Sequence, residues 1–271
     1  MKRLSIAALL AATLFTSCNK IDSVTVQPSV DFSQMEKAMK QNTQVQASLQ
    51  NVSRLVNDIM DKAKVNGRAA DGGNVPTCAN IQTDTKNKSI TVDFGNGCSG
   101  AYGTVKGVIS ISYSGAFGQT GTTITVKMTS LTMGDVSMNG TISLSDFKLN
   151  PANTLEYKIN VNSLNVVTST GSVTTSVAMA QTWKNFLTPS TSDDELLTSL
   201  NGSFKAGDLD YAVETTTSML SKGSCETNVP VSGVVKLSAA GVSGVLDYGS
   251  GTCDTVGILT VGGQSKSIEL K

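Results

Sequence analysis

The feature that most constrains the fold is an alternation of apolar and polar residues that begins near residue 90. Ile90, Val92 and Phe94 alternate with polar residues. The same alternation returns in the segments 109–113, 124–128, 136–144, 155–161, 173–179 and 209–213. This pattern is typical of strands with one buried face and one solvated face. Turn-forming residues separate the segments and leave no room for crossover helices, so we predict antiparallel neighbours.

The predicted fold class is mainly β, with one N-terminal amphipathic helix followed by a large antiparallel β-sheet, open barrel or sandwich. We expect roughly eleven to thirteen strands. After Val161 the apolar phase slips by one residue to Leu164, which predicts a β-bulge. The boundaries predicted for the sheet domain are residues 78–271.

A long irregular segment, residues 184–198, interrupts the strand pattern. It follows Trp183, the single tryptophan, and contains the acidic run Asp193-Asp194-Glu195. Loops of this length often carry function. A solvated surface loop is the other interpretation, and it is the one that we favour from the sequence.

A helix is predicted for residues 32–66, followed by a linker at 67–77. Ser33 and Glu36 have the spacing of a capping box. Apolar residues then recur every three or four positions, at Val45, Leu49, Val52, Val56, Ile59 and Ala63. Such a stripe suits either a partner-binding coiled coil or packing against the chain's own sheet. Gln, Asn and Ser flank the stripe in place of complementary charges, which favours packing against the sheet.

The N-terminus has the features of a bacterial lipoprotein signal. Two basic residues precede an apolar run that is too short to span a bilayer, and Leu14 to Cys18 resembles a lipobox. The resemblance implies a signal peptide at 1–17, acylation of Cys18 with palmitate or a similar chain, and a lipidated tether at 18–31. An ordinary secretory signal is the alternative. Asn19 in place of Asp favours the outer membrane.

Four further cysteines are present at Cys78, Cys98, Cys225 and Cys253. An even number in an exported chain indicates disulfides, and four cysteines allow three pairings. An internal repeat favours Cys78 with Cys98 and Cys225 with Cys253. Metal ligation is the competing interpretation, but the chain has no Cys-x-x-Cys spacing and no histidine.

The internal repeat is a strand that ends in Asp, an aromatic residue, Gly, any residue and Gly before a cysteine. It occurs at 90–98 and again at 245–253. These motifs resemble an uncharacterised family of β-rich, disulfide-containing lipoproteins in gram-negative envelopes, over most of residues 78–271. The resemblance implies the class of protein and no activity. Residues 100–103 are Gly-Ala-Tyr-Gly, whereas the family usually has a basic stretch there.

Candidate ligand or calcium residues are Asp93, Asp247 and Asp254, because carboxylates suit Ca²⁺. Turn capping is the alternative role. A carboxylate pair could also serve glycoside hydrolysis, but only if the ends of the sheet meet. The absence of histidine removes Ser-His-Asp and Cys-His chemistry. We expect no catalytic residues, no enzyme activity, no resident metal and no cofactor.

Charge argues against a nucleic-acid partner. The chain has 21 basic and 21 acidic side chains, and loss of the signal peptide removes two basic ones. No basic cluster is present, although phosphate binding needs one. We expect a membrane-anchored envelope lipoprotein that binds or scaffolds another envelope component. The alternative is a carrier that holds a lipid or other apolar ligand between the sheet and the helix, an arrangement similar to periplasmic lipoprotein carriers.

Overall fold

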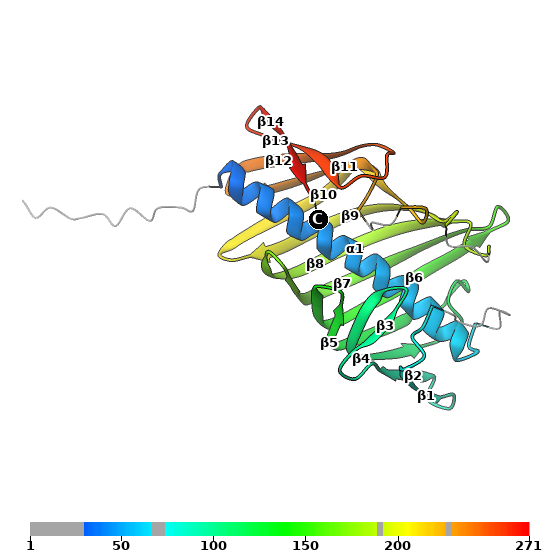
Figure 1. Cartoon of the computed structure of the whole chain (residues 1–271). Coiled ribbons are helices and arrows are strands. Elements are labelled where there is room, and N and C mark those ends of the chain that lie inside the picture. The colour runs from blue at the N-terminus through cyan, green and yellow to red at the C-terminus, as the bar shows by residue number, and fades with distance from the viewer. Residues whose placement is uncertain (1–29, 67–73, 189–191, 226–228, 271) are drawn as a thin grey trace, which may run out of the picture.

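The computed structural model describes residues 30–66, 74–188, 192–225 and 229–270. The predicted signal peptide, Cys18 and most of the predicted tether and linker therefore lie outside the described residues. The rest forms one long helix and a single curved antiparallel sheet (Figure 1). The predicted fold class is confirmed.

Helix α1 runs from Phe32 to Lys62. Its capping box lies two residues earlier than the sequence suggested, because Asp31 rather than Ser33 is the N-cap. The Asp31 carboxylate accepts a hydrogen bond from the backbone N–H of Gln34, and the Gln34 side chain accepts one from the backbone N–H of Asp31. No helix among the described residues has the length and apolarity that a membrane crossing requires.

The described residues contain fourteen strands, slightly more than predicted. Their bounds are β1 (Asn80–Asp84), β2 (Ser89–Asp93), β3 (Cys98–Gly100), β4 (Gly103–Tyr113), β5 (Ile124–Met133), β6 (Val136–Asn150), β7 (Thr154–Thr168), β8 (Gly171–Lys184), β9 (Glu195–Ala206), β10 (Leu209–Lys222), β11 (Ser232–Ala239), β12 (Val242–Ser250), β13 (Val256–Val261) and β14 (Gln264–Glu269). Each strand pairs antiparallel with its neighbours in chain order, and the short β3 pairs with β4 beside the main path. The sheet stays open, with β1 and β14 at its edges.

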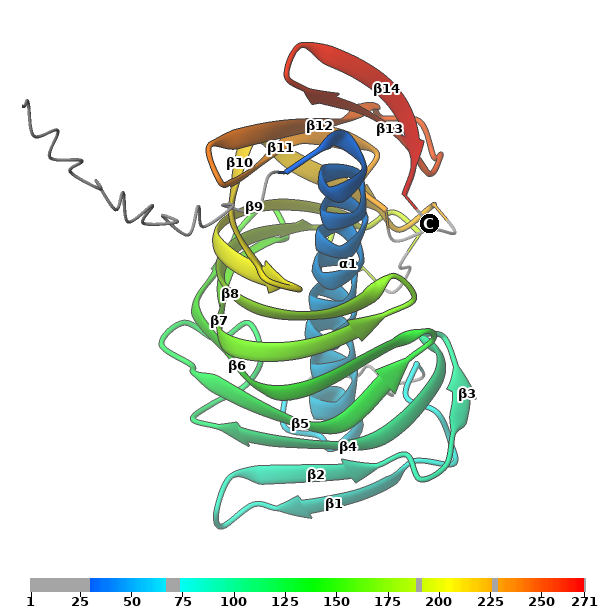
Figure 2. The ribbon, with the colours of Figure 1, turned by 90° about the vertical axis from the view of Figure 1, so that its left-hand side faces the viewer.

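Bulges curve the sheet. The predicted slip after Val161 is confirmed as a register shift between Val161 and Leu164 in the pairing of β7 with β8. A similar shift in β4 lies at Gly107, where a Cβ atom would come within 2.2 Å of the Ser130 carbonyl oxygen. Only glycine fits so close an approach. Because each bulge bends its strand and increases the twist, the sheet wraps around α1 (Figure 2).

Helix α1 lies in the concave face of the sheet and crosses its strands. Side-chain hydrogen bonds join successive turns of the helix to different strands. The Thr43 hydroxyl contacts the Tyr248 hydroxyl of β12 at 2.8 Å, Gln50 donates to Thr198 of β9 at 3.0 Å, and the Ser53 hydroxyl contacts the Tyr157 hydroxyl of β7 at 2.8 Å. The N-terminal turns of α1 therefore lie near β12 to β14 and its C-terminal turns near β3 to β5.

The packing stripe of the helix is wider than the sequence indicated. Apolar residues such as Leu49 and Ile59 are fully buried, as predicted. The polar flank is buried as well, and it includes Gln41, Asn42, Gln46, Gln50 and Asn57. The flank is buried because a curved sheet covers more of a helix than a flat sheet does. The helix is thus the centre of the core rather than a cover on one face.

Candidate functional site

The four cysteines of the sheet domain form the two disulfides that the repeat favoured. Cys78 pairs with Cys98, and Cys225 pairs with Cys253. The first disulfide links the segment before β1 to β3. The second links the connection after β10 to the connection after β12. Each disulfide therefore braces one end of the sheet, and none of the four sulfur atoms is available as a metal ligand.

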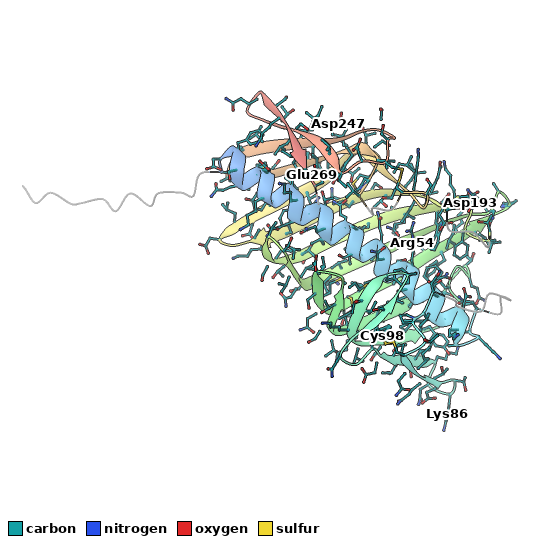
Figure 3. All side chains as sticks on the ribbon, viewed as in Figure 1. Arg54, Lys86, Cys98, Asp193, Asp247 and Glu269 are labelled. Atoms are coloured by element: carbon teal, nitrogen blue, oxygen red, sulfur yellow. A yellow bond between two sulfur atoms is a disulfide. The ribbon has the colours of Figure 1, made fainter. Side chains whose placement is uncertain are left out.

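The structure does not bring the candidate carboxylates Asp93 and Asp247 together. Asp93 ends β2 and Asp247 lies in β12, which are near opposite edges of the sheet. Figure 3 shows the separation between Asp247 and Cys98, the cysteine of the first motif. Each carboxylate accepts a hydrogen bond from a backbone N–H two residues later, and Asp254 does the same from Val256. This is the turn-capping role.

A second group of polar side chains gathers on the side of α1 that the sheet leaves uncovered. Half-buried residues recur there at helical spacing: Glu36, Lys40, Gln44, Ala47, Asn51, Arg54 and Asp58. Arg54 is the centre of the group, and Figure 3 shows its position on the helix. Its guanidinium lies 5.7 Å from the centre of the Trp183 ring. Its Nε and Nη2 atoms are buried and have no hydrogen-bond partner among the described residues.

One rim beside Arg54 is the turn between β3 and β4. The Tyr102 hydroxyl from this turn donates a hydrogen bond to the Asp58 carboxylate of α1. Burial raises the pKa of Tyr102 well above its usual range, and the negative charge of Asp58 raises it further. Tyr102 therefore stays protonated and ties the β3–β4 turn to the helix.

The opposite rim carries Trp183 at the end of β8 and Asp194 just before β9. Both side chains are almost fully buried. Burial raises the pKa of Asp194 to about 6, although the neighbouring Trp183 N–H and the Arg54 charge act against the rise. The Trp183 indole N–H is buried and has no hydrogen-bond partner among the described residues. We call Arg54, Asp58, Tyr102, Trp183 and Asp194 the arginine cluster.

The loop that supplies Asp194 is shorter than the irregular segment that the sequence indicated. Strand β8 extends to Lys184 and β9 begins at Glu195, and an ion pair of 2.8 Å joins these two residues. Within the connection, the Asn185 amide donates to the backbone carbonyl of Asp193 at 2.6 Å. The Asp194 carbonyl accepts the N–H of Gly223 at 2.8 Å. The backbone of Asp194 is therefore fixed against the end of β10, while the Asp193 side chain stays exposed.

The arginine cluster is suited to recognising a polar group rather than to holding a metal. Arg54 is the cation of the cluster and lies near the Asp58 and Asp194 carboxyl groups. The positive charge of Arg54 would repel a divalent metal ion from these carboxyl groups. Across the described ranges, no three His, Cys, Asp or Glu side chains converge as a metal site. A guanidinium with unpaired N–H groups can donate hydrogen bonds to carboxylate or carbonyl oxygens.

Asp194 gives the cluster a measurable pH dependence. Its pKa is higher in the folded chain than the value near 4 of an unfolded one, so folding is favoured when the group is protonated. This contribution is complete below about pH 4 and is lost as the pH rises through about 6. We compare the free energy of unfolding of Asp194→Asn with that of the wild type. We expect this difference to shift in favour of Asp194→Asn by about 1 to 3 kcal/mol when the pH is raised from 4 to 7.5.

Urea unfolding at both pH values checks this prediction. Asp193→Asn is the matched control, because Asp193 is adjacent in sequence but exposed. A stability difference between Asp194→Asn and the wild type that does not change with pH would contradict the burial of the Asp194 carboxyl.

Comparison with family models, with curated protein sequences and with solved structures found no match to this chain.

Sequence reasoning found parts of the arginine cluster but did not bring them together. Trp183 and the acidic run were noted in one segment, and Tyr102 was noted only as a departure from a family motif. Arg54 was missed, although one signal was present. It is the single arginine within a helix whose outward positions otherwise carry Glu, Lys, Gln, Ala, Asn and Asp.

Proposed function

We propose that this chain is a lipid-anchored lipoprotein of the bacterial envelope that binds or scaffolds another envelope component without catalysing a reaction. The outer membrane is the proposed location. Two disulfides support an oxidising, extracytoplasmic environment. The proposed contact surface is the uncovered side of α1, with the arginine cluster at its centre.

The observation that carries the proposal is that α1 fills the concave face of the sheet. Leu49, Leu55 and Ile59 are fully buried, as are the inward residues of the strands that face them. Polar groups of the helix are also joined to β7, β9 and β12 by hydrogen bonds. A carrier of the alternative kind would need space for its cargo between α1 and the sheet. A concave face that is filled by α1 supports binding at the surface instead.

Membrane attachment through Cys18 is a direct consequence of the proposal. We expect Cys18→Ser to move the protein from the membrane fraction to the soluble fraction, because the acyl chains supply the anchor. Metabolic labelling with an alkyne fatty acid should mark the wild type and leave the variant unmarked. A labelled variant, or one that stays in the membrane, would contradict lipidation at this residue.

Binding at the arginine cluster is tested by cross-linking on the native membrane. We expect the wild-type protein to give a discrete cross-linked protein adduct and Arg54→Gln to give much less of it. Lys236→Gln serves as the control, because Lys236 pairs with Glu214 at solvent-accessible positions on the outward face of the sheet, whereas the cluster lies on the side of the helix. Equal adducts from wild type and Arg54→Gln would overturn the proposed surface.

A further inference from the structure

A hollow of about 360 Å³ lies near the C-terminal end of α1, outside the space between helix and sheet. The β4–β5 connection, the end of β6 and the start of the β8–β9 connection form its walls. Its principal lining residues are Asn66, Phe117, Gly118, Leu149, Phe186 and Leu187. No residue of α1 lines it, so it differs from the cavity that a carrier would place under the helix.

The floor of the hollow is aromatic and closely packed. Phe117 and Phe186 are buried, with ring centres 6.0 Å apart. Phe117 also packs against Phe147 at 5.0 Å, and Phe186 packs against Trp183 at 5.1 Å. A Cβ atom on Gly118 would lie 3.2 Å from the Phe186 ring, so glycine lets this wall approach closely. The hollow is thus a formed feature of the aromatic core.

The rim of the hollow is apolar and exposed. Leu149 is 41% exposed and Leu187 is 48% exposed. These two are among the five large apolar side chains that are most exposed in the described part of the chain. Both leucines line the hollow and extend its apolar lining out to solvent, so the rim adds apolar contact for a ligand.

The described walls carry no charge and few free polar atoms. Among the residues that the structure describes, none with an ionisable side chain lines the hollow. The Asn66 amide is already used, since it donates to Asp61 at 2.7 Å and accepts the N–H of Phe117 at 2.9 Å. The Gln119 side-chain oxygen accepts the N–H of Ala116 at 3.1 Å. A charged or polar ligand group would lose its interactions with water on entering the hollow and would find few replacements there.

We propose that this hollow binds the end of a hydrocarbon chain that belongs to an amphiphile with an uncharged headgroup. The volume is near the lower end of the range for ligand sites, which is about 300 to 1,000 Å³, so it takes part of a chain rather than a whole lipid. The exposed leucines leave the mouth open, and the headgroup therefore stays outside. This inference does not rest on the proposed scaffold function.

The single tryptophan makes the site measurable. Trp183 contacts Phe186, and a bromine atom on a bound chain would quench its fluorescence at short range. The probe is dodecyl maltoside brominated on its alkyl chain, used below its micelle-forming concentration with the full-length protein. We expect saturable quenching with one probe bound per chain, and native mass spectrometry should report the same stoichiometry. Decanol should compete for the site and maltose should not.

Two rim variants and one matched control locate the binding. We expect Leu187→Asp and Leu149→Asp to weaken binding by about tenfold or more, because each places a charge on the apolar rim. Ile258→Asp makes the same kind of change at an exposed position of β13 and should leave binding unchanged. The proposal is overturned by quenching that does not saturate, by competition from maltose, or by equal affinity in Leu187→Asp and the wild type. Any of these results would leave the scaffold proposal standing.

Discussion

Replacing Leu49 by alanine is expected to lower the free energy of unfolding by about 3 to 4 kcal/mol. Leu49 lies in the middle of α1 and is fully buried between the helix and the curved sheet. Its truncation removes apolar contact and leaves a cavity that the surrounding strands cannot close, since the hydrogen-bonded sheet is braced at both ends. Urea unfolding followed by far-ultraviolet circular dichroism gives the difference directly.

The matched control for this change is Leu187→Ala, which makes the same truncation at a side chain that is 48% exposed. We expect it to change stability by less than about 0.5 kcal/mol. If Leu49→Ala were no more destabilising than Leu187→Ala, α1 would be a loosely held cover and not the centre of the core.

Removing the disulfide between Cys225 and Cys253 by a double change to serine is expected to destabilise the chain by about 3 to 4 kcal/mol. The two cysteines are 28 residues apart in sequence, and the cross-link mainly restricts the unfolded chain. Unfolding in urea without reductant measures the effect. The corresponding double change at Cys78 and Cys98, which are 20 residues apart, should give a similar and slightly smaller loss.

The two disulfide variants also control for one another. Because the disulfides brace opposite ends of the sheet, their effects should add when both pairs are replaced. A loss below about 1 kcal/mol for either pair would show that the unfolded chain is not restricted by that cross-link. A free thiol in the purified wild-type protein would contradict the pairing itself.

Alternation of apolar residues allowed the sheet to be predicted, because the side-chain period of a strand depends only on backbone geometry. The one-residue shift in the apolar alternation after Val161 also predicted the position of one bulge. The amount of curvature could not be predicted, since it depends on several bulges acting together, including one at Gly107. The burial of Gln46 and Gln50 on the helix follows from that curvature, and a helical wheel alone would place both at the margin of the apolar face.

The candidate site was harder to predict than the fold. Arg54, Tyr102 and Asp194 come from three distant parts of the sequence, and the order of strands around α1 determines that they meet. The carboxylates that the sequence did single out, Asp93 and Asp247, share a local motif but cap turns on distant strands. A local motif predicts local structure, whereas this site is formed by tertiary packing.

Hydrogen exchange of the backbone amides of α1, on the full-length lipidated protein, tests most directly whether the helix is a permanent part of the core. If it is, the amides of residues 42–60 should open with the same free energy as those in the centres of β7 and β8, which corresponds to global unfolding. Helix amides that exchange at a much lower free energy, while β7 and β8 remain protected, would contradict this result. The helix would then be a displaceable segment, and the concave face of the sheet would be free to hold a cargo.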